Sequence, residues 1–135
     1  MYMALNMRAP FFLAQAAAPH LKKTRGVIVT IADLAAFETW PSYVPHGISK
    51  SAVVTMTRAL ARVLAPEIRV AAIAPGTVLL PENWDPAGAE HLIQTTPLAR
   101  NGSPEDVTRT VLFILDSDYL TGETIIVDGG RHVRT

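Results

Sequence analysis

The sequence of 135 residues contains no cysteine. It can therefore form neither a disulfide bond nor a thiolate metal site, which is typical of a protein in a reducing compartment, and we expect a cytoplasmic location. Its 12 basic and 12 acidic residues balance, so the chain has no overall field that would attract nucleic acid or an anionic membrane. The composition favours a small molecule as its partner, with no nucleic acid and no membrane.

Long apolar runs are also absent. The longest, at 13–18 and 27–31, fall far short of the roughly 20 residues that a membrane-spanning helix needs. Residues 1–32 have basic but no acidic residues, a composition that also occurs in organellar presequences. Apolar residues at helical spacing favour a packed helix there instead. They are Leu5, Ala9, Phe12, Leu13 and Ala16.

The order of predicted elements indicates an α/β fold in a single domain, 1–135. After the first helix, the β-branched run 27–31 predicts a strand covered on both faces. A second helix ends at Pro66, and a second buried strand occupies 68–74. The second helix has an apolar stripe at Ile48, Ala52, Met56, Leu60 and Val63.

The region 77–102 is rich in proline and glycine and predicts a long irregular excursion, with a helical turn near 87–94. A third helix begins after Ser103, because an N-cap residue is followed by proline and two acidic residues. A last strand covers 124–127. This alternation predicts a partial Rossmann-like parallel sheet, with three strands joined by crossover helices.

The chain has no G-x-G-x-x-G turn and no P-loop. A doubly wound nucleotide-binding fold uses such a glycine-rich turn after its first strand to hold phosphate. Two interpretations follow: either the protein binds no dinucleotide, or the chain is the second half of a protein that does.

Three polar residues are predicted to converge at the end of the first strand. His46 and Lys50 are four residues apart and project from one face of the second helix. Asp33 follows the first strand, at the carboxyl edge where parallel sheets bind ligands. The alternative interpretation is that Lys50 is a solvated surface residue and that His46 lies at the helix start without a functional role.

Other site types fit the residues less well. The four histidines show no ligand spacing, so we expect no metal. A serine hydrolase is disfavoured because Gly47-Ile48-Ser49-Lys50-Ser51 lacks the final glycine of a nucleophile elbow.

Over essentially its whole length the chain resembles the C-terminal half of a classical short-chain dehydrogenase/reductase. His46-x-x-x-Lys50 falls on the family's Tyr-x-x-x-Lys motif. Four further segments match the family in the correct order: Asn6 on the first helix, the strand 26–31, the strand and turn 68–76, and the closing segments 121–122 and 127–130. The resemblance implies that the family's first four strands are missing here.

The resemblance also implies roles for individual residues. Lys50 would hold the nicotinamide ribose, and Asn6 would anchor a water chain. Pro75, Gly76 and Val78 would contact the nicotinamide carboxamide. The cofactor expected from the family is NADP, with NAD as the alternative, and the expected assembly is a homo-oligomer, a tetramer in the family.

Two positions depart from the family pattern. Asp33, 13 residues before His46, replaces the family's serine, as in pteridine and dihydromonapterin reductases, so a pterin is the leading substrate class. The closing residues 128–134 also resemble a dihydromonapterin reductase. In the excursion 77–102, which matches the family's substrate loop, Trp84 is a candidate to stack on a flat substrate, as is Trp40 earlier in the chain.

His46 replaces the family's tyrosine, which leaves activity open. An imidazole can donate a proton near neutral pH, so His46 could serve as the acid, whereas Tyr43 lies at the helix edge. Three hypotheses remain: an active oxidoreductase that reduces a carbonyl or pterin-like substrate, a non-catalytic family member that binds ligand, or a truncated fragment that acts in oligomerisation.

Overall fold

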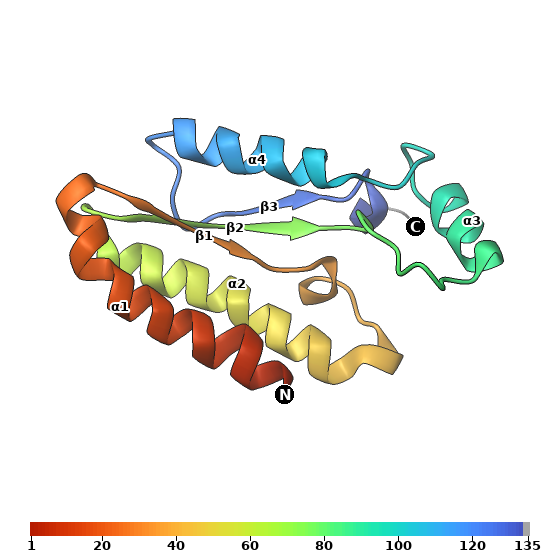
Figure 1. The fold of residues 1–135 in the computed structure, drawn as a ribbon, viewed down its shortest axis with the longest axis horizontal. Coiled ribbons are helices and arrows are strands. Elements are labelled where there is room, and N and C mark those ends of the chain that lie inside the picture. The colour runs from red at the N-terminus through yellow and green to blue at the C-terminus, as the bar shows by residue number, and fades with distance from the viewer. Residues whose placement is uncertain (134–135) are drawn as a thin grey trace.

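The computed structural model describes residues 1–133, so Arg134 of the closing segment lies outside the described residues. A three-stranded parallel sheet in the order β1-β2-β3 is covered by helices on both faces (Figure 1). This confirms the α/β, Rossmann-like fold expected from the sequence. The elements are α1 (Ala9–Thr24), β1 (Val27–Ile31), α2 (Val44–Leu64), β2 (Arg69–Pro75), α3 (Pro86–Gln94), α4 (Pro104–Asp116) and β3 (Thr124–Val127).

The central strand β2 organises the core. Its residues alternate between two faces, as in any strand, and both faces are buried. Val70, Ala72 and Ala74 pack toward α1 and α2, and Ala71 and Ile73 pack toward α4. Because β2 is covered on both sides, its sequence reads as a continuous apolar run without alternation.

The buried face of α1 differs from the predicted one. Leu13 is 71% exposed and Phe12 52% exposed, whereas Ala14 and Ala18 are buried. The small side chains point inward because they allow the helix to approach its neighbours closely. The large apolar side chains consequently lie on the surface.

The apolar stripe predicted on α2 is also only partly buried. Val63 is 75% exposed, while Ser49 and Thr57 are fully buried. Their hydroxyls donate to the carbonyl oxygens of His46 and Val53, at 2.7 and 2.9 Å. Because helical hydrogen bonds satisfy both hydroxyls, these polar residues can occupy the core-facing side.

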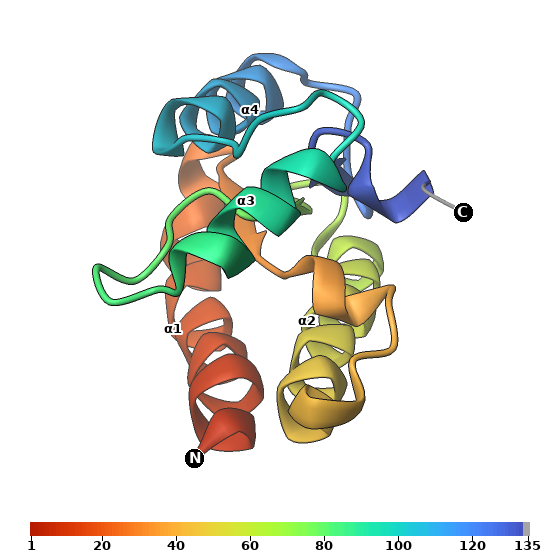
Figure 2. The same cartoon turned by 90° about the vertical axis from the view of Figure 1, so that its right-hand side faces the viewer.

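The carboxyl ends of the strands meet at one end of the molecule, which faces the viewer in Figure 2. There α3 and the loops beside it lie across the sheet. Short 3-10 turns follow β1 at Leu34–Ala36 and precede α2 at Pro41–Tyr43, and a third follows β3 at Arg131–Val133. No helix among the described residues has the length and apolarity to cross a membrane.

Candidate active site

Asp33 and His46 meet at the carboxyl end of β1. Asp33 has an extended backbone and begins the turn Leu34–Ala36, where its Oδ1 accepts a hydrogen bond from the backbone N–H of Ala35 at 2.8 Å. Its Oδ2 lies 3.3 Å from Nε2 of His46, in the first turn of α2. The structure therefore brings together the acid and the imidazole that the sequence placed at one edge.

Lys50 lies one turn after His46 and reaches the same strand end. Its Nζ donates to the carbonyl oxygens of Ile31 at 3.1 Å and Ala32 at 3.2 Å. Burial lowers the pKa of Lys50, and the negative charge of Asp33 opposes that shift. An ammonium group has three N–H donors, so one remains to bind a ligand hydroxyl.

Asn6 connects α1 to the start of α2. It lies in a π-helical turn, Ala4–Arg8, that precedes α1. Its Nδ2 donates to Oγ of Ser49 at 2.9 Å, and Ser49 donates onward to the carbonyl oxygen of His46 at 2.7 Å. This chain of hydrogen bonds holds the turn that carries the imidazole. Sequence analysis did not assign this role to Ser49; the available signal was its position three residues after His46 on the same helix.

A cavity of about 580 Å³ opens beside the Asp33–His46 pair. Its lining comes from the segment between β1 and α2, the start of α2, the end of β2 with the loop after it, α3, and the turn Arg131–Val133. Among them are the predicted Pro75, Gly76 and Trp84, together with Trp40, Tyr43 and Arg131. Val78 lies instead beside Gly102, where an added Cβ would be 2.9 Å from Cγ1 of Val78.

Tyr2 also lines this cavity, and sequence analysis did not identify it. Its ring makes an edge-to-face contact with His46, with ring centroids 5.6 Å apart. It lies one helical turn before Asn6, so the same helical spacing that directs Asn6 toward α2 also directs Tyr2 there. That spacing was the available signal.

Pro75 and Gly76 form a tight exit from β2. The backbone N–H of Gly76 donates to the carbonyl oxygen of Val127 at 2.9 Å. A Cβ added to Gly76 would lie 2.8 Å from Cβ of Asp128, so only glycine allows this close approach. The turn places the backbone of Pro75, Gly76 and Thr77 along the cavity wall.

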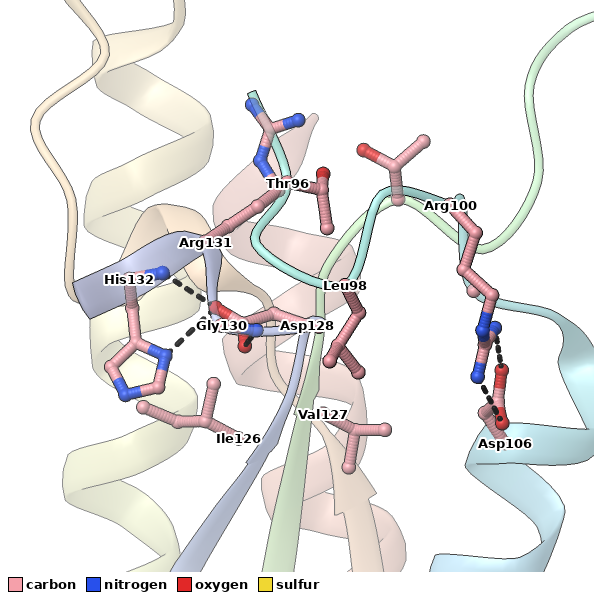
Figure 3. A pocket seen from close by; sticks show the side chains of 13 residues that line it. Thr96, Leu98, Arg100, Asp106, Ile126, Val127, Asp128, Gly130, Arg131 and His132 are labelled. Atoms are coloured by element: carbon pink, nitrogen blue, oxygen red, sulfur yellow. Dashed lines mark hydrogen bonds and ion pairs between the residues drawn. The ribbon is translucent and has the colours of Figure 1, made fainter. Parts of the chain in front are cut away.

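A second cavity, of about 430 Å³, lies at the end of β3 (Figure 3). Arg100 and Asp106 form an ion pair of 2.9 Å on one side, and Asp128 and His132 form one of 2.8 Å on the other. Burial raises the pKa of Asp128, but hydrogen bonds from His132 and Gly130 outweigh it and keep that pKa below its usual value. Since these charges pair with one another, this cavity is a weaker candidate for chemistry.

The residues present fit the nicotinamide end of a dinucleotide. Lys50 has a donor for a ribose hydroxyl, and the Pro75-Gly76 turn offers backbone groups beside the acid and imidazole. No glycine-rich turn in the sequence would hold the phosphates. Within the described residues, no cluster of three histidine, aspartate or glutamate side chains could hold a metal ion.

A family model described as "Enoyl-(Acyl carrier protein) reductase" matches residues 1–132. The chain belongs to the short-chain dehydrogenase/reductase family. It is 37% identical over 130 residues to the Bacillus subtilis short-chain dehydrogenase/reductase homolog YusR, an alignment that covers 93% of this chain and 98% of that relative. The chain spans about half the length of the curated relatives that match first.

Solved structures of the family share the fold. A gluconate 5-dehydrogenase from Burkholderia cenocepacia, in complex with NADP and tartrate, has 27% identity and a TM-score of 0.91, covering 98% of this chain and 55% of that one. A 7α-hydroxysteroid dehydrogenase complexed with NADH and 7-oxo glycochenodeoxycholic acid has 33% identity and a TM-score of 0.88, covering 93% and 52%. Both complexes contain a nicotinamide cofactor.

Proposed function

We propose that this chain forms the catalytic half of an NADPH-dependent oxidoreductase that reduces a carbonyl or pterin-like substrate. The observation that carries the proposal is the Asp33–His46 pair, 3.3 Å apart, in a cavity at the carboxyl end of the sheet. Lys50 stands one turn away, at the lysine position of the family motif.

Each group has a defined task in this proposal. The cofactor supplies a hydride when it is bound. His46 donates a proton to the reduced substrate atom, Lys50 binds the ribose, and the Asn6–Ser49 chain holds the turn that carries His46. NADP is the cofactor expected from the family resemblance, and NAD is the alternative. Of the two similar complexes, one contains NADP and the other NADH.

A pterin-like substrate suits the shape and chemistry of the cavity. Trp40 and Trp84 both line it, and the faces of aromatic side chains stack on flat rings. The Asp33 carboxylate can accept hydrogen bonds from the amino groups of a pterin. Asp33 would thus serve both the substrate and His46.

We also propose that the protein forms a homo-oligomer through α1 and α2. A groove of about 620 Å³ lies between these helices, and its lining is almost entirely apolar. Large exposed apolar side chains such as Phe11 and Phe12 border it. Exposed apolar surface of this kind marks a contact between proteins.

The replacement of the family's tyrosine by His46 favours one competing function, a non-catalytic ligand-binding member. Turnover distinguishes the two. Because the described residues fit only the nicotinamide end, reduced nicotinamide mononucleotide serves as hydride donor beside NADPH, with a dihydropterin as acceptor. The chain should oxidise both donors, and it should bind NADPH weakly.

His46→Gln should lower this turnover by about 10²- to 10⁴-fold, the usual contribution of a general acid. His20→Gln, on the exposed end of α1, is the matched control and should leave turnover unchanged. Absence of turnover in the parent chain would favour the non-catalytic function, and unchanged turnover in His46→Gln would exclude His46 as the acid.

A further inference from the structure

A groove adjoins the candidate active-site cavity and shares one wall with it. The groove has a volume of about 350 Å³ and lies between the turn Leu34–Ala36 and the start of α2. Trp40 and Tyr43 line both the groove and the cavity of about 580 Å³. Their rings meet edge to face, with centroids 6.3 Å apart. The groove therefore begins where the cavity ends.

The shared wall reaches the molecular surface. Tyr43 is 53% exposed and Trp40 is partly exposed, so a ligand can cross these rings from the solvent side. The Trp40 ring is held in place, because its Nε1–H donates to Oε2 of Glu38 at 2.8 Å. Aromatic faces stack on flat groups. A ligand anchored in the cavity can thus extend over this wall into the groove.

The groove is mostly apolar. Phe37, Val44 and Ile48 line it, and each is about half exposed. Backbone forms part of its floor, since a Cβ added to Gly47 would lie 3.1 Å from the carbonyl oxygen of Ala35. Hollows lined by apolar side chains bind apolar parts of ligands. The exposed parts of these three side chains are surface that such a group would remove from water.

Charge restricts which groups the groove accepts. Among the described residues that line it, Glu38 is the one charged residue, and no basic side chain offsets its charge. Like charges repel more strongly at a partly buried position than in bulk water. A ligand group that carries a carboxylate is therefore disfavoured in the groove, and a neutral group is not.

We propose that the groove binds a neutral, apolar arm of the substrate, a substituent on the ring that is reduced in the cavity. This inference rests on the proposed function and specifies which substrates of that class the site selects. Phe37 and Ile48 then determine specificity, although neither lines the cavity itself. Glu38 repels anionic arms and holds the Trp40 ring that the arm crosses.

Calorimetry without cofactor tests the arm site separately from turnover. The probes are 6-methylpterin, which has no arm, the amide of pteroic acid, whose aminobenzoyl arm is neutral, and pteroic acid, whose arm ends in a carboxylate. The amide should bind about tenfold more tightly than 6-methylpterin, because its arm removes apolar surface from water. Pteroic acid should bind about three- to tenfold more weakly than the amide, as expected for one partly screened pair of like charges.

Phe37→Ala should lower the affinity for the amide about fivefold and leave the affinity for 6-methylpterin unchanged, because Phe37 lines the groove alone. Ile48→Ala, at an exposed position on α2, provides a second test if the Phe37 variant does not fold. Phe113→Ala removes a similarly exposed phenylalanine from α4 and is the matched control, which should change neither affinity.

Glu38→Gln tests the charge selection. The glutamine keeps an oxygen acceptor for the Trp40 N–H and removes the negative charge from the groove. In this variant pteroic acid and its amide should bind alike.

Equal affinity of the parent for the amide and 6-methylpterin, or an arm contribution that survives both Phe37→Ala and Ile48→Ala, would overturn the inference and leave the proposed reduction standing. A preference for the amide over the acid that survives Glu38→Gln would overturn the charge selection. A chain that shows the expected affinities but no turnover would retain the arm site and lose the proposed oxidoreductase function.

Discussion

At Lys50, the proposed function has a cost in stability: the ammonium group that would bind the ribose is partly removed from water. Its ammonium group is desolvated, which lowers its pKa below 10.5 despite the attraction of Asp33. The unfolded state therefore holds more protons between the lowered pKa and 10.5. Stability consequently rises with pH across that window, because the folded lysine becomes neutral first.

Lys50→Met should abolish the proposed hydride transfer without lowering the melting temperature at pH 7. The loss of two hydrogen bonds to backbone carbonyls is offset by removal of a half-buried charge. Thermal melts at several pH values check this pH dependence. The melting temperature of the parent should rise relative to that of the variant as the pH increases toward 10.5. A difference in melting temperature that does not change with pH would contradict the assigned burial effect.

Spacing alone placed Asp33, His46 and Lys50 at one strand end, and their contacts agree with that placement. Tyr2 and Ser49 were missed for a physical reason. Their importance depends on the way in which α1 packs against α2, and a single helical pattern does not specify which neighbour a polar side chain meets.

At the scale of elements, local hydrogen bonds around Asp106 stabilise the start of α4. Asp106 accepts hydrogen bonds from the Arg100 guanidinium and from the backbone N–H of Ser103, both at 2.9 Å. These contacts, with the Arg100 bond first, lower the pKa of Asp106 to about 2. Asp106 therefore stabilises the folded state above the unfolded pKa of 3.8, and this contribution is lost as the pH falls toward 2.

Asp106→Asn should lower the melting temperature at pH 7, because it removes the charge that holds Arg100 and weakens the helix cap. The difference in melting temperature between the variant and the parent should disappear between about pH 4 and pH 2, as followed by circular dichroism. Asp118→Asn, in the exposed turn after α4, is the control and should change little. A difference in melting temperature that persists at pH 2 would contradict this account, because it would show that the charge of Asp106 is not what stabilises the helix start.

The helix starts and strand positions could be predicted because caps, prolines and β-branched runs act locally. The inward faces of α1 and α2 could not, because Ala14, Ala18, Ser49 and Thr57 are buried in place of larger apolar residues. Close packing selects small side chains there. Hydrophobic periodicity gives the correct period but assigns the large side chains to the core.

At the scale of the whole molecule, the main feature is uncovered surface at the edge of the sheet and between two helices. One side of β1 has no neighbouring strand among residues 1–133, and the α1–α2 groove is apolar. The family resemblance implied both a partial sheet and an oligomer. The sheet is confirmed, and the oligomer stays a proposal because one chain cannot display its partner.

Phe12→Glu tests the oligomer. It places a charge beside the α1–α2 groove, where Phe12 is half exposed in the single chain. Light scattering should give a multiple of the 14.6 kDa chain mass for the parent and a lower mass for the variant. Tyr119→Glu, at a fully exposed position, should keep the parent mass. A monomeric parent, or an unaffected Phe12→Glu variant, would contradict the proposed interface.

The most direct test of the account is to locate the nicotinamide on the chain by titration with oxidised nicotinamide mononucleotide. Proton NMR resolves imidazole signals, and the chain has four histidines; His46 lines one cavity and His132 the other. His46→Gln and His132→Gln assign the two signals. We predict that the His46 signal moves during the titration and the His132 signal does not. Movement of His132 alone, or of neither, would contradict a hydride-transfer site at the end of β1.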